Sequence, residues 1–443
     1  MKFRSGIGIG IALLVLAPVH GADLLGVYRL AKQNDPSFAA AQAQYQADQE
    51  RLPQGLALLL PVIEAEAGTN INDLKNRSDL VDVDNRFNDH GWSVSLTQPI
   101  FRWENFVQYK QAGFQVQQAG AVFEQSKQDL IVRVADAYFN VLAAQDTLAF
   151  TRAEKISISE QLAQAKRNFE VGTATITDTN EAQARYDLSA AQEIAALNDL
   201  EIAQRALEQI TASLANELTP LKPDLRISPP QPNDMNQWVE GALSNNLGIK
   251  ANEAALEVAT REIERQRAGH YPTVDLVASY QDSTTNQGVF SVGGPARIQT
   301  EGSTIGLQLN MPLFAGGAVN SRTREAVALR ERARSNLEGA RRSAQFDARQ
   351  SFLNVKNGQA RVLALEQALV SSETALKSNR VGYEVGVRIN IDVLDAQQQV
   401  YQTQRDLARA RYDTIISGLR LKAAAGTLNE QDVEAVNTLL AGR

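Results

Sequence analysis

The chain has 443 residues, of which 44% are hydrophobic and 21% are charged, and its net charge is −7 at pH 7. These values are ordinary for a folded protein and exclude gross disorder. The acidic balance argues against a nucleic-acid partner, because no basic stripe is available to neutralise phosphates. The sequence contains no cysteine, which excludes disulfides, thiol nucleophiles, Cys-ligated zinc and lipoprotein acylation.

Residues 1–21 have the pattern of a secretory signal peptide. Lys2 and Arg4 precede an apolar run at residues 7–16, and cleavage is expected after Gly21. A membrane anchor is the alternative, but the apolar run is too short to span a bilayer. No later stretch is long and apolar enough for a transmembrane helix, so the sequence predicts an exported protein that is either soluble or a membrane β-barrel.

The two halves of the chain repeat each other. FEVGTATITDTNEAQ at residues 169–183 matches YEVGVRINIDVLDAQ at residues 383–397, and AYFNV at residues 137–141 matches SFLNV at residues 351–355. Chance similarity would not keep the same register over several blocks. We therefore interpret the sequence as a tandem duplication.

Each half is predicted to contain the same elements in the same order: short helices, a pair of strands, and two long helices joined by a turn. The expected boundaries are a first repeat at 22–218, with strands 62–70 and 92–100 and helices 103–170 and 178–218; a proline-rich linker at 219–236; a second repeat at 237–426, with strands 273–281 and 304–312 and helices 318–385 and 392–425; and a C-terminal segment at 427–443.

The last predicted strand alternates most clearly. Ile305, Leu307, Leu309 and Met311 fall on one face, and polar residues or glycine fall on the other. Strands of about 9–11 residues with one apolar and one polar face suit the wall of a membrane barrel. A half-buried strand of a soluble sheet is the alternative.

The long helices are predicted where proline is absent, since a helix interior tolerates proline poorly. The range 103–170 allows about 100 Å of continuous helix. Apolar and small residues recur along it with coiled-coil spacing. Helical hairpins of this length cannot bury their apolar stripes alone, so they must pack on each other, on partner chains, or on both.

One chain supplies four predicted strands, which is too few to close a membrane barrel. Two chains would supply eight strands and three would supply twelve, and the same number of chains would assemble the long helices into one tube. A barrel continued by a hollow helical cylinder is a conduit.

On these residues the chain resembles the TolC-type outer membrane factors, the exit ducts of Gram-negative export machines. The most specific motifs are GYEVGVRINIDVLDAQ at residues 382–397, the proline–hydrophobic–Phe strand ends at 99–101 and 312–314, and GTLNEQD at 426–432. The resemblance implies a mixed α and β membrane protein. Its homotrimer would form a 12-stranded β-barrel continued by a 12-helix periplasmic tunnel.

The resemblance also implies a passive export channel in the Gram-negative outer membrane, with no enzymatic activity and no cofactor. Its expected partners are outer membrane lipid, a periplasmic adaptor and an inner-membrane RND or ABC transporter. Multidrug efflux and type I protein secretion both stay open. A soluble periplasmic coiled-coil adaptor has no use for lipid-facing strands. A secreted hydrolase needs a nucleophile, base or metal cluster, and His90 and His270 lie far apart.

Two acidic residues, Asp392 and Asp395, lie three positions apart at the start of a predicted helix, so both point to the same side. The resemblance implies that they line the constriction. A trimer would then hold six carboxylates in a narrow ring, which attracts and is blocked by cations without binding a resident metal. The alternative is that acids at a helix start only complement the helix dipole.

The resemblance further implies a latch between Tyr383 and Arg388 on the second turn and Thr177 and Asp178 on the first. A hydroxyl and a guanidinium bonded to a carboxylate make a strong contact that can still be broken. The alternative is that these residues are exposed without a special role. The expected hinge glycines are Gly172, Gly382 and Gly386.

The two halves differ at the latch positions. The first half has Phe169 and Ala174 where the second has Tyr383 and Arg388. This asymmetry suggests that only the second helical hairpin moves when the channel opens.

Overall fold

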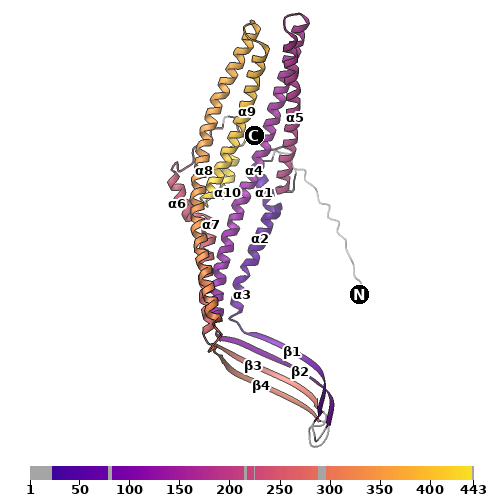
Figure 1. The fold of residues 1–443 in the computed structure, drawn as a ribbon, viewed down its shortest axis with the longest axis vertical. Helices are drawn as coiled ribbons and strands as arrows, with labels where there is room; N and C mark the ends of the chain where they lie inside the picture. The colour runs from indigo at the N-terminus through magenta and orange to yellow at the C-terminus, as the bar shows by residue number, and fades with distance from the viewer. Residues whose placement is uncertain (1–21, 78–81, 214–216, 224, 288–295, 442–443) are drawn as a thin grey trace, which may run out of the picture.

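The computed structural model describes residues 22–77, 82–213, 217–223, 225–287 and 296–441, so the expected signal peptide lies outside the described residues. The molecule is elongated, with a β-sheet at one end and the turns of two long helical hairpins at the other (Figure 1).

The sheet has four antiparallel strands in the order β1-β2-β3-β4. The strands are β1 (Val62–Arg77), β2 (Asp82–Phe101), β3 (Thr273–Gln287) and β4 (Ala296–Asn310). The central pair, β2 with β3, joins the two halves of the chain, and its register shifts between Pro99 and Phe101. Proline has no N–H to donate to the ladder, which accounts for the irregularity at this point.

All four strands differ in length from the expected ranges, 62–70, 92–100, 273–281 and 304–312. The polar segments between the expected strands pair as well, as far as Arg77 opposite Asp82 and Gln287 opposite Ala296. Backbone hydrogen bonds form whatever the polarity of the side chains, so Asn- and Asp-rich composition did not mark a loop here. Strand β4 ends at Asn310, two residues before Pro312.

The sheet has one apolar face and one polar face. Residues directly opposite each other in an antiparallel pair lie on the same face. The apolar face carries Ile63, Ala65, Trp92, Val94, Leu96, Leu276, Ala278, Tyr280, Ile305 and Leu307. The polar face carries Glu64, Glu66, Ser93, Ser95, Thr97, Ser279, Gln281, Thr304 and Gln308. Ile305 and Leu307 are 76% and 73% exposed, so the part of the chain that the structure describes leaves the apolar face uncovered.

Two helical hairpins make up the long part of the molecule. The first consists of α4 (Trp103–Glu170) and α5 (Ile176–Thr211), and the second of α8 (Ala318–Glu384) and α9 (Asn390–Ala424). The shorter helices are α1 (Leu24–Asn34), α2 (Pro36–Gln49), α3 (Arg51–Ala57), α6 (Met235–Asn245), α7 (Leu247–Arg267), the 3-10 turn η1 (Ala268–His270) and α10 (Glu430–Asn437). Among the described residues, none of the helices has the length and hydropathy needed to cross a membrane.

Several helix ends differ from the expected ones. Helix α5 stops at Thr211 rather than 218, because Ala212 takes a left-handed conformation (φ 53°) and the following residues form backbone bridges, Leu218 with Ala22 and Leu221 with Leu440. Helix α6 begins at Met235, inside the expected linker. Helices α5 and α9 each begin two residues before the expected start, and α8 and α9 each end one residue early.

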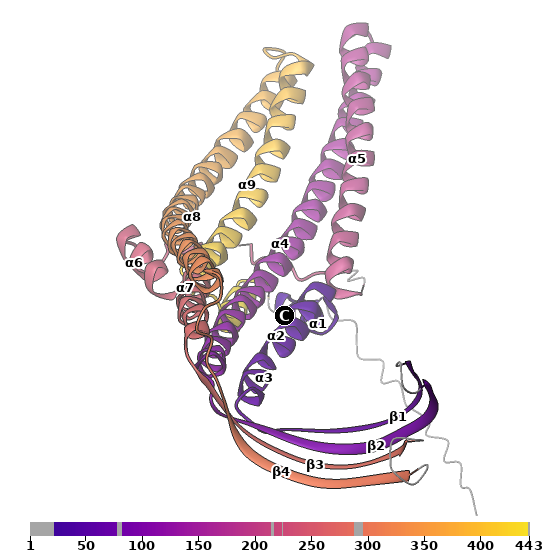
Figure 2. The same cartoon turned by 60° about the horizontal axis from the view of Figure 1, so that its bottom comes forward.

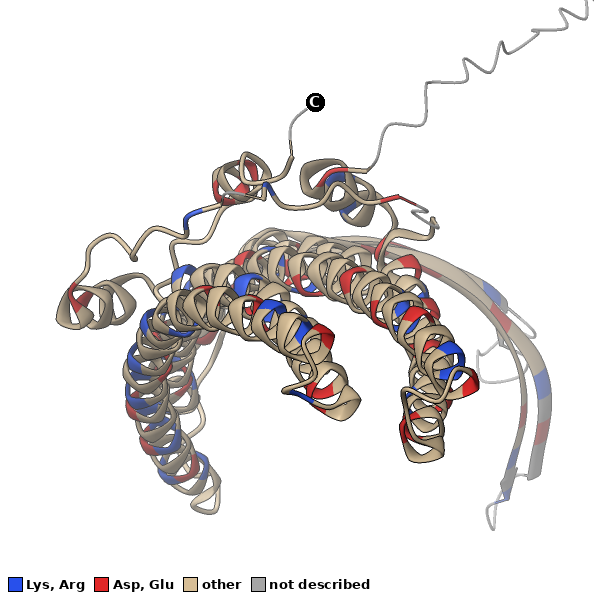
Figure 3. Ribbon diagram, turned by 90° about the horizontal axis from the view of Figure 1, so that it is seen from above, with Lys and Arg blue, Asp and Glu red and all other residues tan. Residues whose placement is uncertain are grey.

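The long helices follow a curved row, and short helices lie on its convex side (Figure 3). The sheet continues from the lower ends of the helices and is itself curved (Figure 2). Arg102 fixes this junction, since its Nε and Nη2 each donate to a carboxylate oxygen of Asp275 at 2.7 Å.

The largest buried core lies where α1, α4, α5, α9 and α10 meet. Tyr138 and Phe139 are fully buried there, and the Phe139 ring lies 5.6 Å from the Tyr412 ring. The Tyr412 hydroxyl donates to Asp146 Oδ2 at 2.6 Å. Burial raises the pKa of Asp146, and the hydrogen bond from Tyr412 opposes this rise. Farther along the same two helices, Arg405 pairs with Glu154 at 2.8 Å.

We predict that Gly426→Ala destabilises the fold by about 1–3 kcal/mol. Gly426 has φ 70°, and an added Cβ would lie 2.3 Å from the carbonyl oxygen of Asn245. As a matched control, Gly241→Ala lies in α6 with no atom within 4 Å of its added Cβ, and it should stabilise the protein by about 0.5–1 kcal/mol. Thermal unfolding in detergent, followed by circular dichroism, measures both. Equal melting temperatures for the two variants would contradict the prediction.

Candidate functional site

The predicted site residues gather at the end of the molecule that lies away from the sheet. The α4–α5 turn and the α8–α9 turn both lie there (Figure 1). The two turns therefore form one tip, to which each half of the chain contributes one turn.

Both turns have the same backbone geometry. Gly172, two residues after the end of α4, has φ 82°, and Gly386, two residues after the end of α8, has φ 78°. In the first turn, the N–H of Gly172 bonds to Phe169 O and the N–H of Thr173 to Asn168 O, while the second turn repeats this pattern from Gly386 to Tyr383 and from Val387 to Gly382. This is the Schellman motif, which places glycine at the left-handed position.

Gly382, the third expected hinge glycine, has a different role in the turn. It lies inside α8, is buried, and has no positive φ. Its carbonyl oxygen accepts hydrogen bonds from the N–H groups of Val387 and Arg388. An added Cβ would lie 2.7 Å from Arg388 Cγ, so glycine is needed here for space beside Arg388.

The helices that follow the two turns begin differently. Thr175 caps α5, because its hydroxyl accepts from the N–H of Asp178 at 3.2 Å and its own N–H donates to Asp178 Oδ2 at 2.9 Å. This reciprocal arrangement is a capping box. In the second turn Ile389 stands at the corresponding position and makes no side-chain cap. The Asp392 carboxylate is therefore not used in a cap and lies 3.6 Å from Arg388 Nη1.

The structure connects the predicted latch residues to other partners than those expected. The Tyr383 hydroxyl accepts from Asn168 Nδ2 at 3.3 Å, so it does join the two turns. Arg388, in the turn before α9, pairs with Asp392 of the same hairpin. Within the described part of one chain, neither residue bonds to Thr177 or Asp178. The reasons are local: the cap of α5 holds Asp178, and Asp392 lies only four positions after Arg388.

Asp395 is 58% exposed and has a partner that sequence reasoning missed. Arg185 of α5 donates from Nη2 to Asp395 Oδ1 at 2.5 Å and from Nη1 to Gln398 Oε1 at 2.6 Å. The repeat contains no signal for this contact, because Gln399 stands at the position that corresponds to Arg185. Sequence reasoning also missed Asn168, the partner of Tyr383, because the repeat contains no signal for that contact either.

Two amide side chains near the tip are fully buried. Asn390 and Gln397 of α9 are 1% and 0% exposed, and neither the nitrogen nor the oxygen of either amide has a protein partner among the described residues. Buried polar groups without partners destabilise the packing around them. The start of α9 is thus held less firmly than its buried area alone would indicate.

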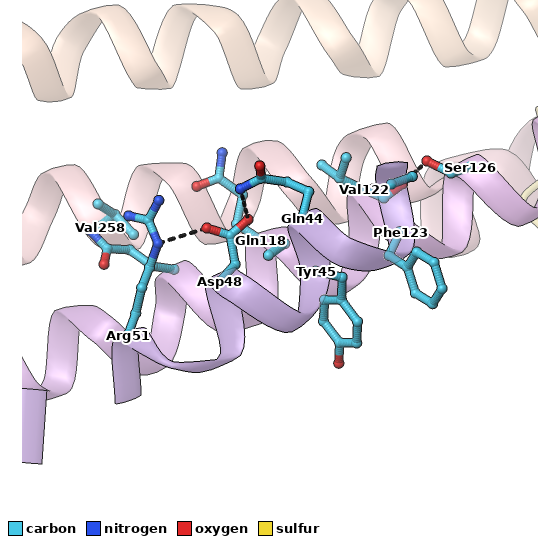
Figure 4. Close-up of a pocket in the computed structure, with 12 residues that line it drawn as sticks. Gln44, Tyr45, Asp48, Arg51, Gln118, Val122, Phe123, Ser126 and Val258 are labelled. Carbon is cyan, nitrogen blue, oxygen red and sulfur yellow. Dashed lines mark hydrogen bonds and ion pairs between the residues drawn. The ribbon is translucent and has the colours of Figure 1, made fainter. Parts of the chain in front are cut away.

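A separate cleft of about 290 Å³ lies far from the tip, between α2, α4 and α7 (Figure 4). Its charged groups satisfy each other, since Arg51 Nε lies 2.8 Å from Asp48 Oδ1. The hydrogen bond from Gln44, together with Arg51, lowers the pKa of Asp48. Over the described ranges, no three His, Cys, Asp or Glu side chains lie close enough together to hold a metal ion.

We predict opposite effects for two changes at the helix caps. Thr175→Ala removes the capping box of α5 and should lower stability by about 0.5–2 kcal/mol. Ile389→Thr supplies the missing cap residue three positions before Asp392, and should raise stability by a similar amount. Thermal unfolding of the purified variants gives the two signs. A loss of stability in Ile389→Thr would show that a threonine at position 389 does not form a capping box with Asp392.

The sequence matches the family model described as outer membrane efflux protein over residues 27–213 and 238–427. The outer membrane protein TolC of Vibrio cholerae is 35% identical over 95% of this chain and 94% of its own length. The alkaline protease secretion protein AprF of Pseudomonas aeruginosa is 32% identical over 96% of this chain and 88% of its own length.

Solved structures share the fold. The CmeC outer membrane channel of Campylobacter jejuni has a TM-score of 0.80 at 15% identity and covers 100% of this chain, with 98% of its own chain covered. The outer membrane protein VceC of Vibrio cholerae has a TM-score of 0.77 at 20% identity, with coverage of 91% and 96%. The chain thus belongs to the outer membrane efflux protein family, and it is an outer membrane channel of a Gram-negative cell.

Proposed function

We propose that three copies of this chain form one continuous duct, a 12-stranded β-barrel in the outer membrane continued by a 12-helix tunnel in the periplasm. The observation that carries the proposal is the two-faced sheet of four strands joined directly to two long helical hairpins. Each part is incomplete in one chain, and the same assembly completes both.

The sheet supports closure by several chains. Within the described residues of this chain, its outer strands β1 and β4 pair on one side only, and unpaired strand edges are not tolerated in lipid. Its apolar face has the character of a lipid-facing wall and its polar face that of a water-filled lumen. Four strands per copy give twelve in a trimer, which is a size that membrane barrels adopt.

The helices support the tunnel. Both hairpins leave large apolar side chains exposed, among them Ile194 and Ile202 on α5 and Phe346 and Leu363 on α8, which are 59–71% exposed. Such side chains on coiled-coil helices call for neighbouring helices. Adjacent copies around a closed ring would supply them.

We propose that the duct receives its substrates from an inner-membrane RND or ABC transporter through a periplasmic adaptor. Relatives are described as serving alkaline protease secretion in Pseudomonas aeruginosa, protease secretion in Dickeya chrysanthemi and solvent efflux in Pseudomonas putida. The duct of this chain would serve type I protein secretion, multidrug efflux or both.

We propose that the tip is the gate. Asp392 and Asp395 of three copies would form the carboxylate ring of the constriction. Tyr383 and Arg388 would hold the second hairpin closed, and its movement would open the duct. The contact between Tyr383 and Asn168 supports a role in joining the hairpins. Contacts of Arg388 with Thr177 and Asp178 would have to come from an adjacent copy.

Purified protein in planar lipid bilayers tests the channel and its latch together. The wild-type protein should give discrete channels of low conductance, and its failure to form any channel would contradict the proposed function. Tyr383→Phe with Arg388→Ser should raise the conductance, because both groups that hold the second hairpin are removed. Arg380→Ser changes an exposed arginine on the same helix and should leave the conductance at the wild-type level.

Cation block tests the carboxylate ring. Divalent or trivalent cations added on the periplasmic side should block the wild-type channel, since crowded carboxylates attract multivalent cations. Asp392→Ala with Asp395→Ala should abolish the block. Glu384→Ala removes an exposed carboxylate at the same end of the molecule and should preserve it. Equal block in all three proteins would exclude the ring as the blocking site.

A further inference from the structure

The contact between Arg185 and α9 links the two hairpins close to the tip. Among the described residues, three ion pairs join the first hairpin to the second: Arg185–Asp395, Arg405–Glu154 and Arg420–Asp136. The last two lie along α4 toward the middle of the molecule. Arg185 is the member of this set that reaches the helical turn carrying the constriction carboxylates.

The geometry of the contact favours a defined position of α9. Two different nitrogens of one guanidinium bond to two different side chains, Nη2 to Asp395 and Nη1 to Gln398. Asp395 and Gln398 are three residues apart and therefore share one face of α9. A rigid planar fork that bonds to two groups fixes orientation as well as distance. Arg185 thus sets the rotation of α9 about its own axis at this point.

Little apolar surface supports the same junction. The buried cluster beside it consists of Ile158, Leu162, Ala165, Ala182 and Leu394, with Tyr186 at its edge. From the second hairpin it contains Leu394 alone, and alanine side chains bury little area. The polar contacts of Arg185, together with the hydrogen bond between Asn168 and Tyr383, therefore supplement a small apolar contact between the two hairpins here.

The contact also changes the charge that Asp395 presents. Asp395 is an exposed carboxylate whose side chain is 58% accessible, and Arg185 is 30% accessible. A guanidinium at hydrogen-bond distance offsets most of the negative field of the carboxylate toward a third ion. While Arg185 is in place, Asp395 contributes less to cation binding than its position alone would indicate.

We propose that Arg185 is a gating residue with two effects. It clasps the second hairpin to the first in the closed channel, and it masks the negative charge of the Asp395 carboxylate until the second hairpin moves. This inference rests on the proposed channel function. The role is specific to the first hairpin, because the second hairpin has Gln399 at the position that corresponds to Arg185.

Substitutions at Arg185, studied in planar bilayers, test the two properties separately. Arg185→Gln removes both the clasp between the hairpins and the masking of Asp395, and it should raise the resting conductance. It should also lower the cation concentration for half-maximal block by about two- to fivefold, the shift in equilibrium that an exposed ion pair supports. Arg185→Lys keeps the charge but loses the planar fork, so it should raise the conductance with a smaller change in block.

Two further variants separate a clasp from a general loss of packing. Arg185→Glu combined with Asp395→Arg restores an ion pair of reversed direction and should return the conductance toward the wild-type value. Arg152→Gln removes a pair with Glu193, 2.9 Å long, that lies wholly within the first hairpin, and it should leave conductance and block unchanged.

The outcomes distinguish this inference from the proposed function. Wild-type conductance and block in Arg185→Gln would overturn the role of Arg185, even if the Tyr383→Phe, Arg388→Ser channel opens. An Arg152→Gln channel that opens as far as Arg185→Gln would also overturn it, because any weakened ion pair would then suffice. Absence of channels in the wild-type protein would instead contradict the proposed function.

Discussion

The structure depends on a seam between α4 and α9, where buried polar contacts join the two halves of the chain. Glu154 and Arg405 are only 4% and 17% exposed, and Tyr412 donates a hydrogen bond to the half-buried carboxylate of Asp146. Removal of one partner from a buried ion pair leaves the other charge uncompensated, at a cost of about 3–5 kcal/mol. The seam therefore fixes the position of α9 along α4, at Glu154, roughly 24 Å from the end of α4 at 1.5 Å per residue.

The attachment between the halves is strong below the seam and weak above it. Toward the sheet, β2 and β3 share a backbone ladder and Arg102 holds Asp275 with two hydrogen bonds. Toward the tip, the halves share a small apolar cluster, and α9 begins with buried amides at Asn390 and Gln397 that have no partner among the residues described by the structure. Local opening takes place where few apolar contacts must be broken. The same gradient supports the proposed position of the gate at the tip.

The sequence predicted features that depend on local chemistry. It placed the turns after α4 and α8, where Gly172 and Gly386 take the left-handed conformation that a Schellman turn requires, and the alternation in β4 correctly separated an apolar from a polar face. Features set by distant parts of the chain could not be predicted in this way. The strands extend through polar segments because a partner strand is present, and α5 stops at Thr211 because the following residues bridge to Ala22 and Leu440.

The candidate site shows the same division between features with a local sequence signal and contacts between distant parts of the chain. The acids on α9 were identifiable from their spacing, but the partner of Asp395 lies 210 positions away, and a one-sided contact leaves no trace in the repeat. The cap of α5 also had a sequence signal, since Thr175 and Asp178 have capping-box spacing. Its consequence for the latch, that Asp178 is already engaged in its own chain, became clear only from the geometry.

The two acids at the start of α9 are neutralised in different ways, and this difference links movement to charge. Asp392 faces Arg388 of the same hairpin, so the two residues move together and their pairing survives a rigid displacement of that hairpin. Asp395 faces Arg185 of the other hairpin, so the same displacement separates them. With Arg185 as the clasp, opening would unmask one carboxylate per copy, and the charge at the entrance would depend on the state of the gate.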